Sequence, residues 1–417
     1  MIDEGGGMRP EINTERLKTL LDGINAFGRA EGGGFNRPGF SEADMAVRDW
    51  FAREMEADGL IVSRDGANSV FGRYGAADAP SVMVGSHLDT VASGGAFDGA
   101  LGVAVALECV RAMKEARFTP ARPIEVVATS EEEGRFGGML GSQTIAGLVT
   151  RDWLESAADA DGLLLTDAML AKGLDPQAVL ASARPRGSVK AFLELHIEQG
   201  PVLEREGIAI GLPQGATGIV NLHVRLSGIA NHSGTTPMDM RADAFAGLAE
   251  IAVHIPAMIA ASGSDDARIT IGKVELSPNH PHTIPGEAVF TVIIRDARED
   301  VMRSLQTRLG EVAGEVVRKH GLSLSIEENS FIAPVAFDAG LIDMLDTEAR
   351  RLGLPARRMI SGAGHDAQTM TALCPSAMIF VPSRNGISHA PEEHSDWADI
   401  EKGAQLMLAA LMRLGEG

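Results

Sequence analysis

Histidine and carboxylate side chains follow a strand-like apolar run in a stretch that has little other bulk. The segment GSHLDTVASGGAFDG, residues 85–99, comes directly after the apolar run 81–84 and contains His87, Asp89 and Asp98. Most residues between them are small, so little side chain is available to shield these charges. Imidazole and carboxylate groups are ligands that suit zinc, manganese and cobalt. The segment therefore indicates a metal site at the end of a strand.

Residues of the same chemical types follow other predicted strands. They are Glu131, Glu132 and Glu133 after the strand 123–129, His196 at the end of the strand 191–196, and His389 after the strand 376–381. In open α/β sheets, ligands bind at the carboxyl ends of the strands. So many carboxylates at one edge would repel one another unless cations compensate them. A pair of divalent cations would remove this repulsion.

Each of these patterns also has an ordinary structural explanation. A lone His-x-Asp pair is usually a surface pair or a capped turn, and a run of three glutamates is usually a solvated helix or loop face. The metal site is favoured because the groups recur at successive strand ends, not because of any one pattern.

Strands that alternate with helices predict a largely parallel sheet covered on both faces. We expect helices at 41–58, 99–116, 338–352 and 397–413, and strands near 60–72, 81–86, 123–129, 191–196 and 376–381. Between them, a strand 218–227, a helix 240–260, strands 268–276 and 287–296, a helix 299–319 and a strand 321–327 follow the β-α-β-β-α-β order. We therefore predict an α/β domain formed by 1–212 and 329–417, with a compact α+β domain inserted at 213–328.

Composition and charge exclude several functional classes. The chain has 417 residues and a formal charge of −20, which argues against nucleic-acid binding and against anionic membrane surfaces. No run of about eighteen uncharged apolar residues predicts a membrane span. The N-terminal MIDEGGGMRPE lacks the regions of a signal peptide. Cys109 and Cys374 lie in apolar contexts, as buried thiols of a cytoplasmic protein would.

Seven motifs occur in an order that resembles one enzyme family. They are GSHLDTV…GGAFDGALGV, TSEEEGRFGGMLGS, ELHIEQGPVLE, GIANHSGTTPMDMRADA, IPGEAVFTVIIRDAR, SGAGHDA and GISHAPEEHS. The chain resembles, over about residues 40–410, the dinuclear-metal amidohydrolases that include N-carbamoyl-L-amino acid hydrolase, allantoate amidohydrolase and β-ureidopropionase. These belong to the wider aminoacylase and carboxypeptidase superfamily. The resemblance implies a zinc-exopeptidase-like catalytic domain with a ferredoxin-like lid or dimerisation domain inserted.

The resemblance also implies which residues hold the metal. It assigns His87, Asp98 and His196 to one ion, and Asp98, Glu133 and His389 to the other, with Asp98 bridging. The expected ions are Zn²⁺, with Mn²⁺ or Co²⁺ as alternatives.

Two further carboxylates take catalytic roles by the same resemblance. Asp89 is expected to fix the tautomer of His87, and Glu132 to act as general base toward a water whose pKa the two ions lower. From the residues alone, Glu131 could replace either of its neighbours, although the Glu-Glu-Gly pattern of the family favours Glu132 and Glu133.

The substrate contacts that the resemblance implies come mainly from the inserted domain. His232 is expected to stabilise the oxyanion, often across a dimer interface, and Arg295 to bind the substrate carboxylate. Gln199 is expected to contact the ureido or amide group. The position thirteen before the arginine is normally asparagine in these enzymes, and here it is His282, which leaves the substrate open. No role is assigned to His365 or His394.

These residues predict a hydrolase of the ureido or amide C–N bond in N-carbamoyl amino acids or in ureido acids such as allantoate. The alternative within enzymes is an aminoacylase or a dipeptidase-like enzyme that cleaves an N-acyl amide. A non-catalytic relative would have lost metal ligands, and all five candidate ligands and Glu132 are present. The expected substrate is a small molecule with a carboxylate, and we expect a homodimer formed through the inserted domain.

Overall fold

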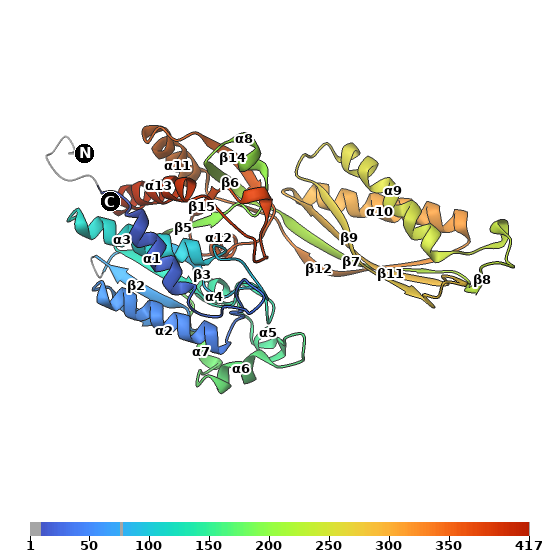
Figure 1. Cartoon of the computed structure of the whole chain (residues 1–417), viewed down its shortest axis with the longest axis horizontal. Coiled ribbons are helices and arrows are strands. Elements are labelled where there is room, and N and C mark those ends of the chain that lie inside the picture. The colour runs from blue at the N-terminus through green and yellow to red at the C-terminus, as the bar shows by residue number, and fades with distance from the viewer. Residues whose placement is uncertain (1–9, 76–77, 417) are drawn as a thin grey trace. The chain divides into compact units, whose positions relative to one another are not determined.

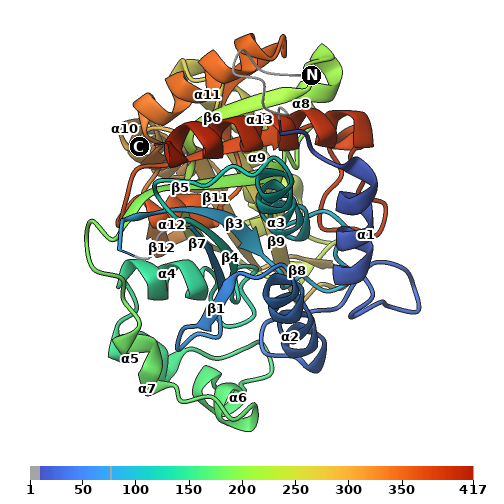
Figure 2. The same cartoon turned by 90° about the vertical axis from the view of Figure 1, so that its left-hand side faces the viewer.

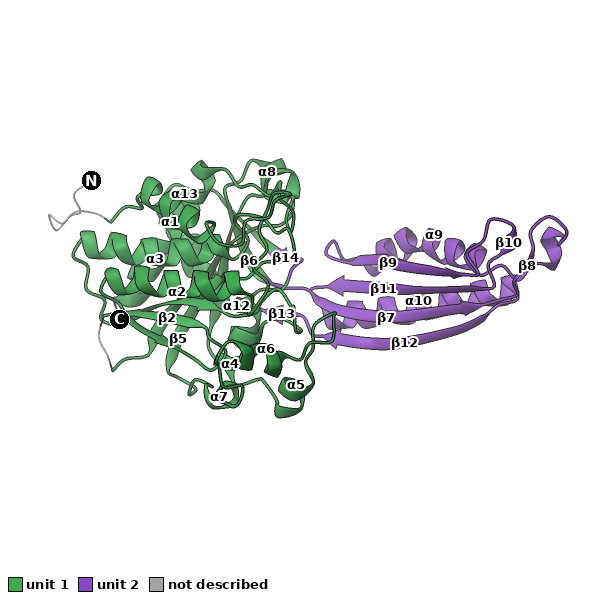
Figure 3. Cartoon of the chain, turned by 60° about the horizontal axis from the view of Figure 1, so that its bottom comes forward, with its two compact units in different colours: residues 1–214, 337–359, 364–417 green, residues 215–336, 360–363 purple. Residues whose placement is uncertain are grey.

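The computed structural model describes residues 10–75 and 78–416, in two compact units. Unit 1 comprises Met1–Gln214, Phe337–Met359 and Gly364–Gly417, and unit 2 comprises Gly215–Ala336 and Ile360–Ala363 (Figure 3). The expected boundary at 328 falls inside a strand that continues to Ile332. The polar run Glu327–Ser330 and a bulge at Glu328 hide the alternation of that strand in the sequence. The N-terminal residues 1–9, expected to carry no signal peptide, lie outside the described residues.

Unit 1 is built on a mixed sheet with the strand order β1-β2-β4-β3-β5-β15-β6. Its strands are β1 (Ile61–Arg64), β2 (Val70–Tyr74), β3 (Ser81–His87), β4 (Ile124–Thr129), β5 (Val189–Ile197), β6 (Ile210–Ala216) and β15 (Ser376–Val381), with β14 (Ala356–Ser361) also on β6. The four central strands β4, β3, β5 and β15 are parallel, and the outer pairs β1–β2, β2–β4 and β15–β6 are antiparallel. The predicted fold class, a largely parallel sheet in an α/β domain, is confirmed.

Helices cover both faces of this sheet. Leu195 and Glu194 are neighbours on β5, so they point to opposite faces. Leu195 lies against Gly403 of α13 (Trp397–Gly415), and Glu194 accepts a hydrogen bond from the Ala367 amide of α12 (Asp366–Met370). The two helices therefore lie on opposite faces. On the α13 face, that helix packs beside α3 (Ala100–Glu115), which lies over β3, β4 and β5 (Figure 2).

The long amphipathic helices expected in unit 1 are all present. The remaining helices are α1 (Thr14–Ile24), α2 (Glu42–Ala57), α4 (Leu140–Ala146), α5 (Arg151–Ser156), α6 (Leu165–Ala171), α7 (Gln177–Ala181), α8 (Val202–Glu206) and α11 (Ala339–Arg351). Ser41 caps α2, because its side chain accepts a hydrogen bond from the Asp44 amide. The sequence did not predict α1, α4 to α8 or α12. All of these except α1 have only five to seven residues, too few to show a helical period. Both cysteines are buried free thiols, as expected.

Unit 2 contains a four-stranded antiparallel sheet with the order β12-β7-β11-β9 (Figure 1). Its elements are β7 (Gly218–Ser227), α9 (Ala244–Ser262), β9 (Arg268–Ser277), β11 (Glu287–Asp296), α10 (Glu299–His320) and β12 (Ser323–Ile332). This is the predicted β-α-β-β-α-β sequence, and both helices pack on the sheet. The side chains of β7 alternate between buried and partly exposed, so one face of the strand packs beneath the helices. A separate two-stranded antiparallel sheet pairs β8 (Asn231–His232) with β10 (Thr283–Ile284).

One helix among the described residues, α9, is long and apolar enough to cross a membrane, with a mean hydropathy of 1.7. A single helix of this kind is weak evidence for a membrane span. Here α9 packs on β7, β9 and β11, and its Glu250 is paired with Lys319 and His320 of α10. The sequence did not predict a span at this position, because Glu250 and His254 interrupt the apolar run.

The close packing of β3 on β4 gives a first prediction. A Cβ atom at Gly85 would lie 1.8 Å from the carbonyl oxygen of Val127, so Gly85→Ala should lower the free energy of unfolding by about 3 kcal/mol. Gly310, inside α10, is the control, because nothing lies within 4 Å of its Cβ position. Gly310→Ala should stabilise the protein by about 0.5–1 kcal/mol through helix propensity. Chemical denaturation midpoints would measure both, and equal midpoints for the two variants would contradict this account of β3.

Candidate functional site

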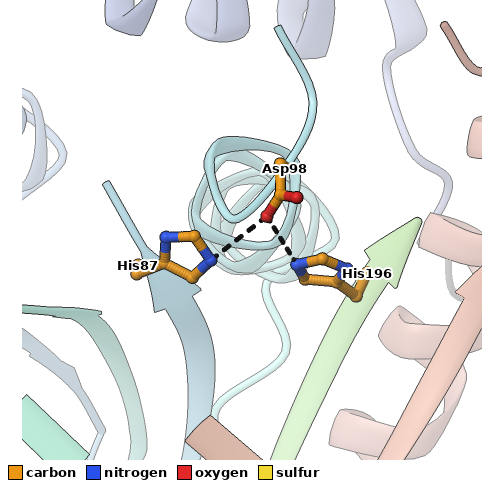
Figure 4. A group of neighbouring side chains, drawn as sticks. All are labelled: His87, Asp98 and His196. Carbon is orange, nitrogen blue, oxygen red and sulfur yellow. Dashed lines mark ion pairs between the residues drawn. The ribbon is translucent and has the colours of Figure 1, made fainter. Parts of the chain in front are cut away.

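The carboxylate of Asp98 lies at the centre of the predicted metal ligands. The loop after β3 returns to the strand end, where Asp98 Oδ1 is 3.3 Å from His87 Nε2 and 3.1 Å from His196 Nε2 (Figure 4). The other oxygen, Oδ2, is 3.4 Å from His389 Nε2. Each oxygen of Asp98 therefore faces a different set of imidazoles, which is the arrangement that a bridging carboxylate requires.

Backbone carbonyls fix the orientation of the two buried imidazoles. His87 Nδ1 lies 3.0 Å from the carbonyl oxygen of Asp89, and His196 Nδ1 lies 2.9 Å from that of Ile197. A carbonyl oxygen can only accept, so each Nδ1 carries a proton, and Nε2 is the ring nitrogen that faces Asp98 and would bind an ion. The tautomer that a metal ligand needs is thus set by the chain itself.

The second predicted group is also brought together. One ligand atom each of Asp98, Glu133 and His389 lies within 4.8 Å of the others, as do those of His87, Asp98 and His196. Glu133 Oε2 is 3.5 Å from His389 Nε2, while Glu133 Oε1 is buried without a hydrogen-bond partner. His389 comes from the loop after β15 and is half-exposed, so this group faces solvent more than the first.

The pKa values of the carboxyl groups show how poorly this site accommodates negative charge. Burial and the negative charge of Asp98 raise the pKa of Glu133 to about 7. Burial raises the pKa of Glu132 well above its ordinary value. The hydrogen bond to Asp98 raises the pKa of His389 to about 9. Crowded carboxylates, imidazole lone pairs and an unpartnered buried oxygen form a donor set that fits divalent cations.

The three consecutive glutamates point in different directions. Glu132 is buried with Oε2 3.6 Å from His87 Nε2, and Glu133 joins the group of His389. Glu131 has a positive φ of 53° and turns away, so that its oxygens accept hydrogen bonds from the amides of Phe136 and Gly138. Burial raises the pKa of Glu131 to about 8. The structure therefore separates three glutamates that residue type alone does not distinguish, and it turns Glu131 away from the ligand groups.

The Asp89 carboxylate does not make the contact expected of it. Its Oδ1 is 3.9 Å from His87 Nδ1, and its backbone carbonyl fixes the tautomer instead. Asp89 Oδ2 accepts a hydrogen bond from the Glu133 amide, so this carboxylate ties the β3 loop to the β4 loop. Beneath it lies Arg48 of α2, fully buried and bonded to Asp44 and to the carbonyl of Ala128.

Sequence reasoning missed a third group of possible ligands, formed by Glu194, His196 and His365. Glu194 and His196 are two residues apart on β5 and share a face, which is the signal that could have revealed the pair. Both oxygens of Glu194 already accept hydrogen bonds, from Ser86 Oγ and the Ala367 amide. Burial and the nearby His196 hold the pKa of His365 well below its ordinary value. This group therefore braces β5 and α12 rather than offering free ligands at Glu194.

Gln199 lies beside the second group, at the end of β5. It has a positive φ of 57°, and its Nε2 donates to Asp98 Oδ2 at 2.8 Å. The same nitrogen is 3.3 Å from His389 Nε2. Gln199 thus lies where it could contact a ligand held next to Asp98.

The other predicted substrate contacts lie in unit 2 and fall at opposite ends of its sheet. His232 on β8 pairs with Thr283, and the amide of Ser233 donates to the carbonyl of His282, so the two histidines are neighbours. Nδ1 of His232 accepts from the amides of Gly234 and Thr235, which leaves Nε2 as an exposed donor.

Arg295 is at the far end of β11, where its Nη1 donates to the carbonyl of Gly362. Eight residues of strand, about 26 Å, separate it from Glu287, which lies at the His232 end. The structure therefore does not bring His232 and Arg295 together within one chain.

Comparison with known proteins places this geometry in a family. Residues 83–413 match peptidase family M20/M25/M40. The chain belongs to this family. The M20 match includes every residue of the two ligand groups, and the ends of the matched range lie in β3 and α13.

Relatives of this M20 chain that align over nearly their full length are named as amidohydrolases. It is 37% identical over 408 residues to an N-carbamoyl-L-amino-acid amidohydrolase of Paenarthrobacter aurescens, covering 97% of this chain and 98% of the relative. It is 35% identical over 405 residues to the allantoate amidohydrolase of Escherichia coli (strain K12), covering 96% and 98%. A crystal structure of an amidase of the hydantoinase/carbamoylase family from Burkholderia multivorans matches with a TM-score of 0.91 and 32% identity over 97% and 98% of the two chains. The expected family resemblance and the expected class, a hydrolase of non-peptide C–N bonds, are confirmed.

The shared carboxylate gives the second prediction. His389→Ala should lower the number of tightly bound divalent ions by one, whereas Asp98→Ala should remove both, because each oxygen of Asp98 serves one group. Metal content after dialysis against trace zinc would measure the stoichiometry. His223→Ala, on β7 of unit 2, is the matched control and should bind as many ions as the unaltered protein. Equal stoichiometry for the two site variants would contradict a shared Asp98.

Proposed function

We propose that this chain is a metal-dependent amidohydrolase that cleaves the ureido C–N bond of N-carbamoyl amino acids or of related ureido acids such as allantoate. The observation that carries the proposal is the Asp98 carboxylate between two sets of imidazoles, with Glu132 buried 3.6 Å from one of them. The names of the full-length relatives support the same bond type.

Two divalent ions, proposed as Zn²⁺ with Mn²⁺ or Co²⁺ as alternatives, are proposed to be held by the two groups that share Asp98. When bound, such ions polarise the scissile carbonyl and lower the pKa of water. The donor set of three imidazoles and two carboxylates supports zinc. The backbone carbonyls of Asp89 and Ile197 would keep the imidazoles of His87 and His196 in the ligating tautomer.

Glu132 is proposed as the general base. Its Oε2 would take a proton from the attacking water and return it to the leaving nitrogen. Burial raises the pKa of Glu132, His87 opposes this shift, and the neighbouring carboxylates Asp366, Glu133 and Asp89 add to it. Such a base works best when its pKa lies near the working pH.

The substrate's carboxylate would be bound by Arg295, whose planar guanidinium suits bidentate contacts. Gln199 would contact the ureido group, and His282 would stand where an amide is usual in the related enzymes. Because imidazole differs from amide in shape and charge, an N-acyl amino acid remains the alternative substrate. The negative charge of the whole chain makes a local cation necessary for an anionic substrate. A cytoplasmic location agrees with the buried thiols.

A homodimer through unit 2 is proposed because His232 and Arg295 lie too far apart to contact one small molecule from the same chain. The exposed face of α9 carries Phe245 and Val253, which lie about two turns apart, and β9 is an edge strand of the described sheet. An apolar helix face beside an unpaired strand edge suits contact with a second copy. His232 of one chain would then stabilise the oxyanion of the substrate bound by Arg295 of the other.

Assays with a substrate panel test the reaction. The purified protein with zinc, manganese or cobalt should release ammonia from N-carbamoyl amino acids or allantoate faster than it releases acetate from N-acetyl amino acids. Glu132→Gln should keep its bound metal but lose at least about a thousandfold in kcat, because general acid–base catalysis contributes about 10²–10⁴-fold. Faster acetate release would favour the aminoacylase alternative, and a Glu132→Gln variant above a tenth of normal activity would remove Glu132 from its role.

Mixing two inactive variants tests whether His232 acts across a dimer. Glu132→Gln and His232→Ala chains, refolded together, should regain about a quarter of normal activity, because half of the dimers are mixed and each mixed dimer has one intact site. Each variant refolded alone is the control and should stay inactive. Recovery no greater than the sum of the two controls, or sedimentation as a monomer, would exclude the contribution in trans.

A further inference from the structure

A buried carboxylate outside the two ligand groups connects the loops that carry them. Glu393 lies four residues after His389 and is 4% exposed. Its Oε1 accepts hydrogen bonds from the amides of Phe97, at 2.9 Å, and Asp98, at 3.0 Å. Its Oε2 accepts from Ser388 Oγ at 2.8 Å. One side chain thus joins the Asp98 loop to the His389 loop, across 295 residues of sequence.

Neither loop is held in place by regular structure at these positions. Asp98 precedes α3, which begins at Ala100, so the amides of Phe97 and Asp98 have no helical partner. His389 has a positive φ of 56°, a conformation that persists only where the surroundings impose it. Ser388 Oγ also lies 3.1 Å from Asp98 Oδ2, so the hydroxyl between Glu393 and Asp98 touches both. The carboxylate therefore satisfies the groups that set the position of both loops.

The packing around Glu393 leaves no room for a looser arrangement. A Cβ atom at Gly95 would lie 2.0 Å from Glu393 Oε1, so the β3 loop passes directly over the carboxylate. The Phe97 ring packs edge-on against His394, with centroids 5.6 Å apart, and against Trp397. Glycine at 95 is the residue that permits this approach.

We propose that Glu393 is a positioning residue that fixes the separation of Asp98 from His389, and so sets the affinity for the ion that Asp98, Glu133 and His389 share. The inference rests on the metal centre proposed above. Glu393 itself does not bind the ion, because both of its oxygens are occupied by hydrogen-bond donors of the two loops. Such indirect supports of metal ligands commonly change affinity by about 10–100-fold.

Glu393 could instead act only by adding negative charge near the cations. The isosteric variant Glu393→Gln distinguishes this charge role from the positioning role. In Glu393→Gln the amide oxygen can still accept from the Phe97 and Asp98 amides, and the amide nitrogen can donate to Ser388 Oγ. Ser388 can then donate to Asp98 Oδ2. The hydrogen bonds between the two loops are kept while the charge is lost. A positioning role therefore predicts near-normal metal affinity for this variant, and a charge role predicts weakened affinity.

The test is a titration of Zn²⁺ into the metal-free full-length protein in competition with a chromophoric chelator. Glu393→Ala should weaken the binding step that is absent in His389→Ala by at least about tenfold, and Glu393→Gln should change it by less than about threefold. Gly95→Ala displaces the carboxylate without removing it and should weaken the same step. This second route keeps the inference testable if Glu393→Ala does not fold.

The control is Glu108→Ala. Glu108 is a fully buried carboxylate of α3 that accepts hydrogen bonds from the Asn13 amide and from Arg16. Like Glu393, it therefore joins two segments that are far apart in the sequence. Its loss should lower stability and leave both zinc steps unchanged. The inference fails if Glu393→Ala binds both ions as the unaltered protein does, or if Glu393→Gln is as weak as Glu393→Ala. If the unaltered protein binds no zinc, the proposed function fails together with it.

Discussion

The site depends on one carboxylate, Asp98, whose two oxygens face different imidazoles. His87 and His196 lie at one oxygen and His389 at the other. Burial by itself raises the pKa of Asp98, but His196, His389 and His87 hold it well below its ordinary value. A charge kept ionised in the interior needs such partners on every side. The loop, the strand ends and their supports all serve to keep this one carboxylate surrounded.

Charges near Asp98 are compensated by the protein in two different ways. Asp89 and Glu131 accept backbone amides, and the fully buried Arg48 lies between Asp44 and Asp89. These groups are compensated by backbone amides and by the Arg48 guanidinium. Glu132 and Glu133 face imidazoles instead: Glu132 Oε2 is 3.6 Å from His87 Nε2, and Glu133 Oε2 is 3.5 Å from His389 Nε2. The difference separates carboxylates that hold the loops in place from those that are available to cations and substrate.

The sequence could predict the parts of the fold that arise from local patterns. The parallel strands β3, β4, β5 and β15 and the helices α2, α3, α11 and α13 were found within a few residues, whereas α1 was missed. A gathering of histidines and carboxylates could be predicted because the carboxyl ends of parallel strands meet at one edge, whereas their division into two ligand groups came from the family resemblance. The short helices α4 to α8 and the extension of β12 to Ile332 could not, since they have too few periodic residues.

What the sequence by itself determined was the set of chemical groups and the strands that deliver them. Only the tertiary structure decided among Glu131, Glu132 and Glu133, because a positive φ at Glu131 turns that side chain toward the backbone. The backbone carbonyl of Asp89, rather than a carboxylate, fixes the tautomer of His87, and Arg48 is buried beside Asp89. His232 and Arg295 lie at opposite ends of the unit 2 sheet. Only the tertiary structure decided these points. These outcomes depend on contacts between residues far apart in the chain, and no local pattern of residue types records them.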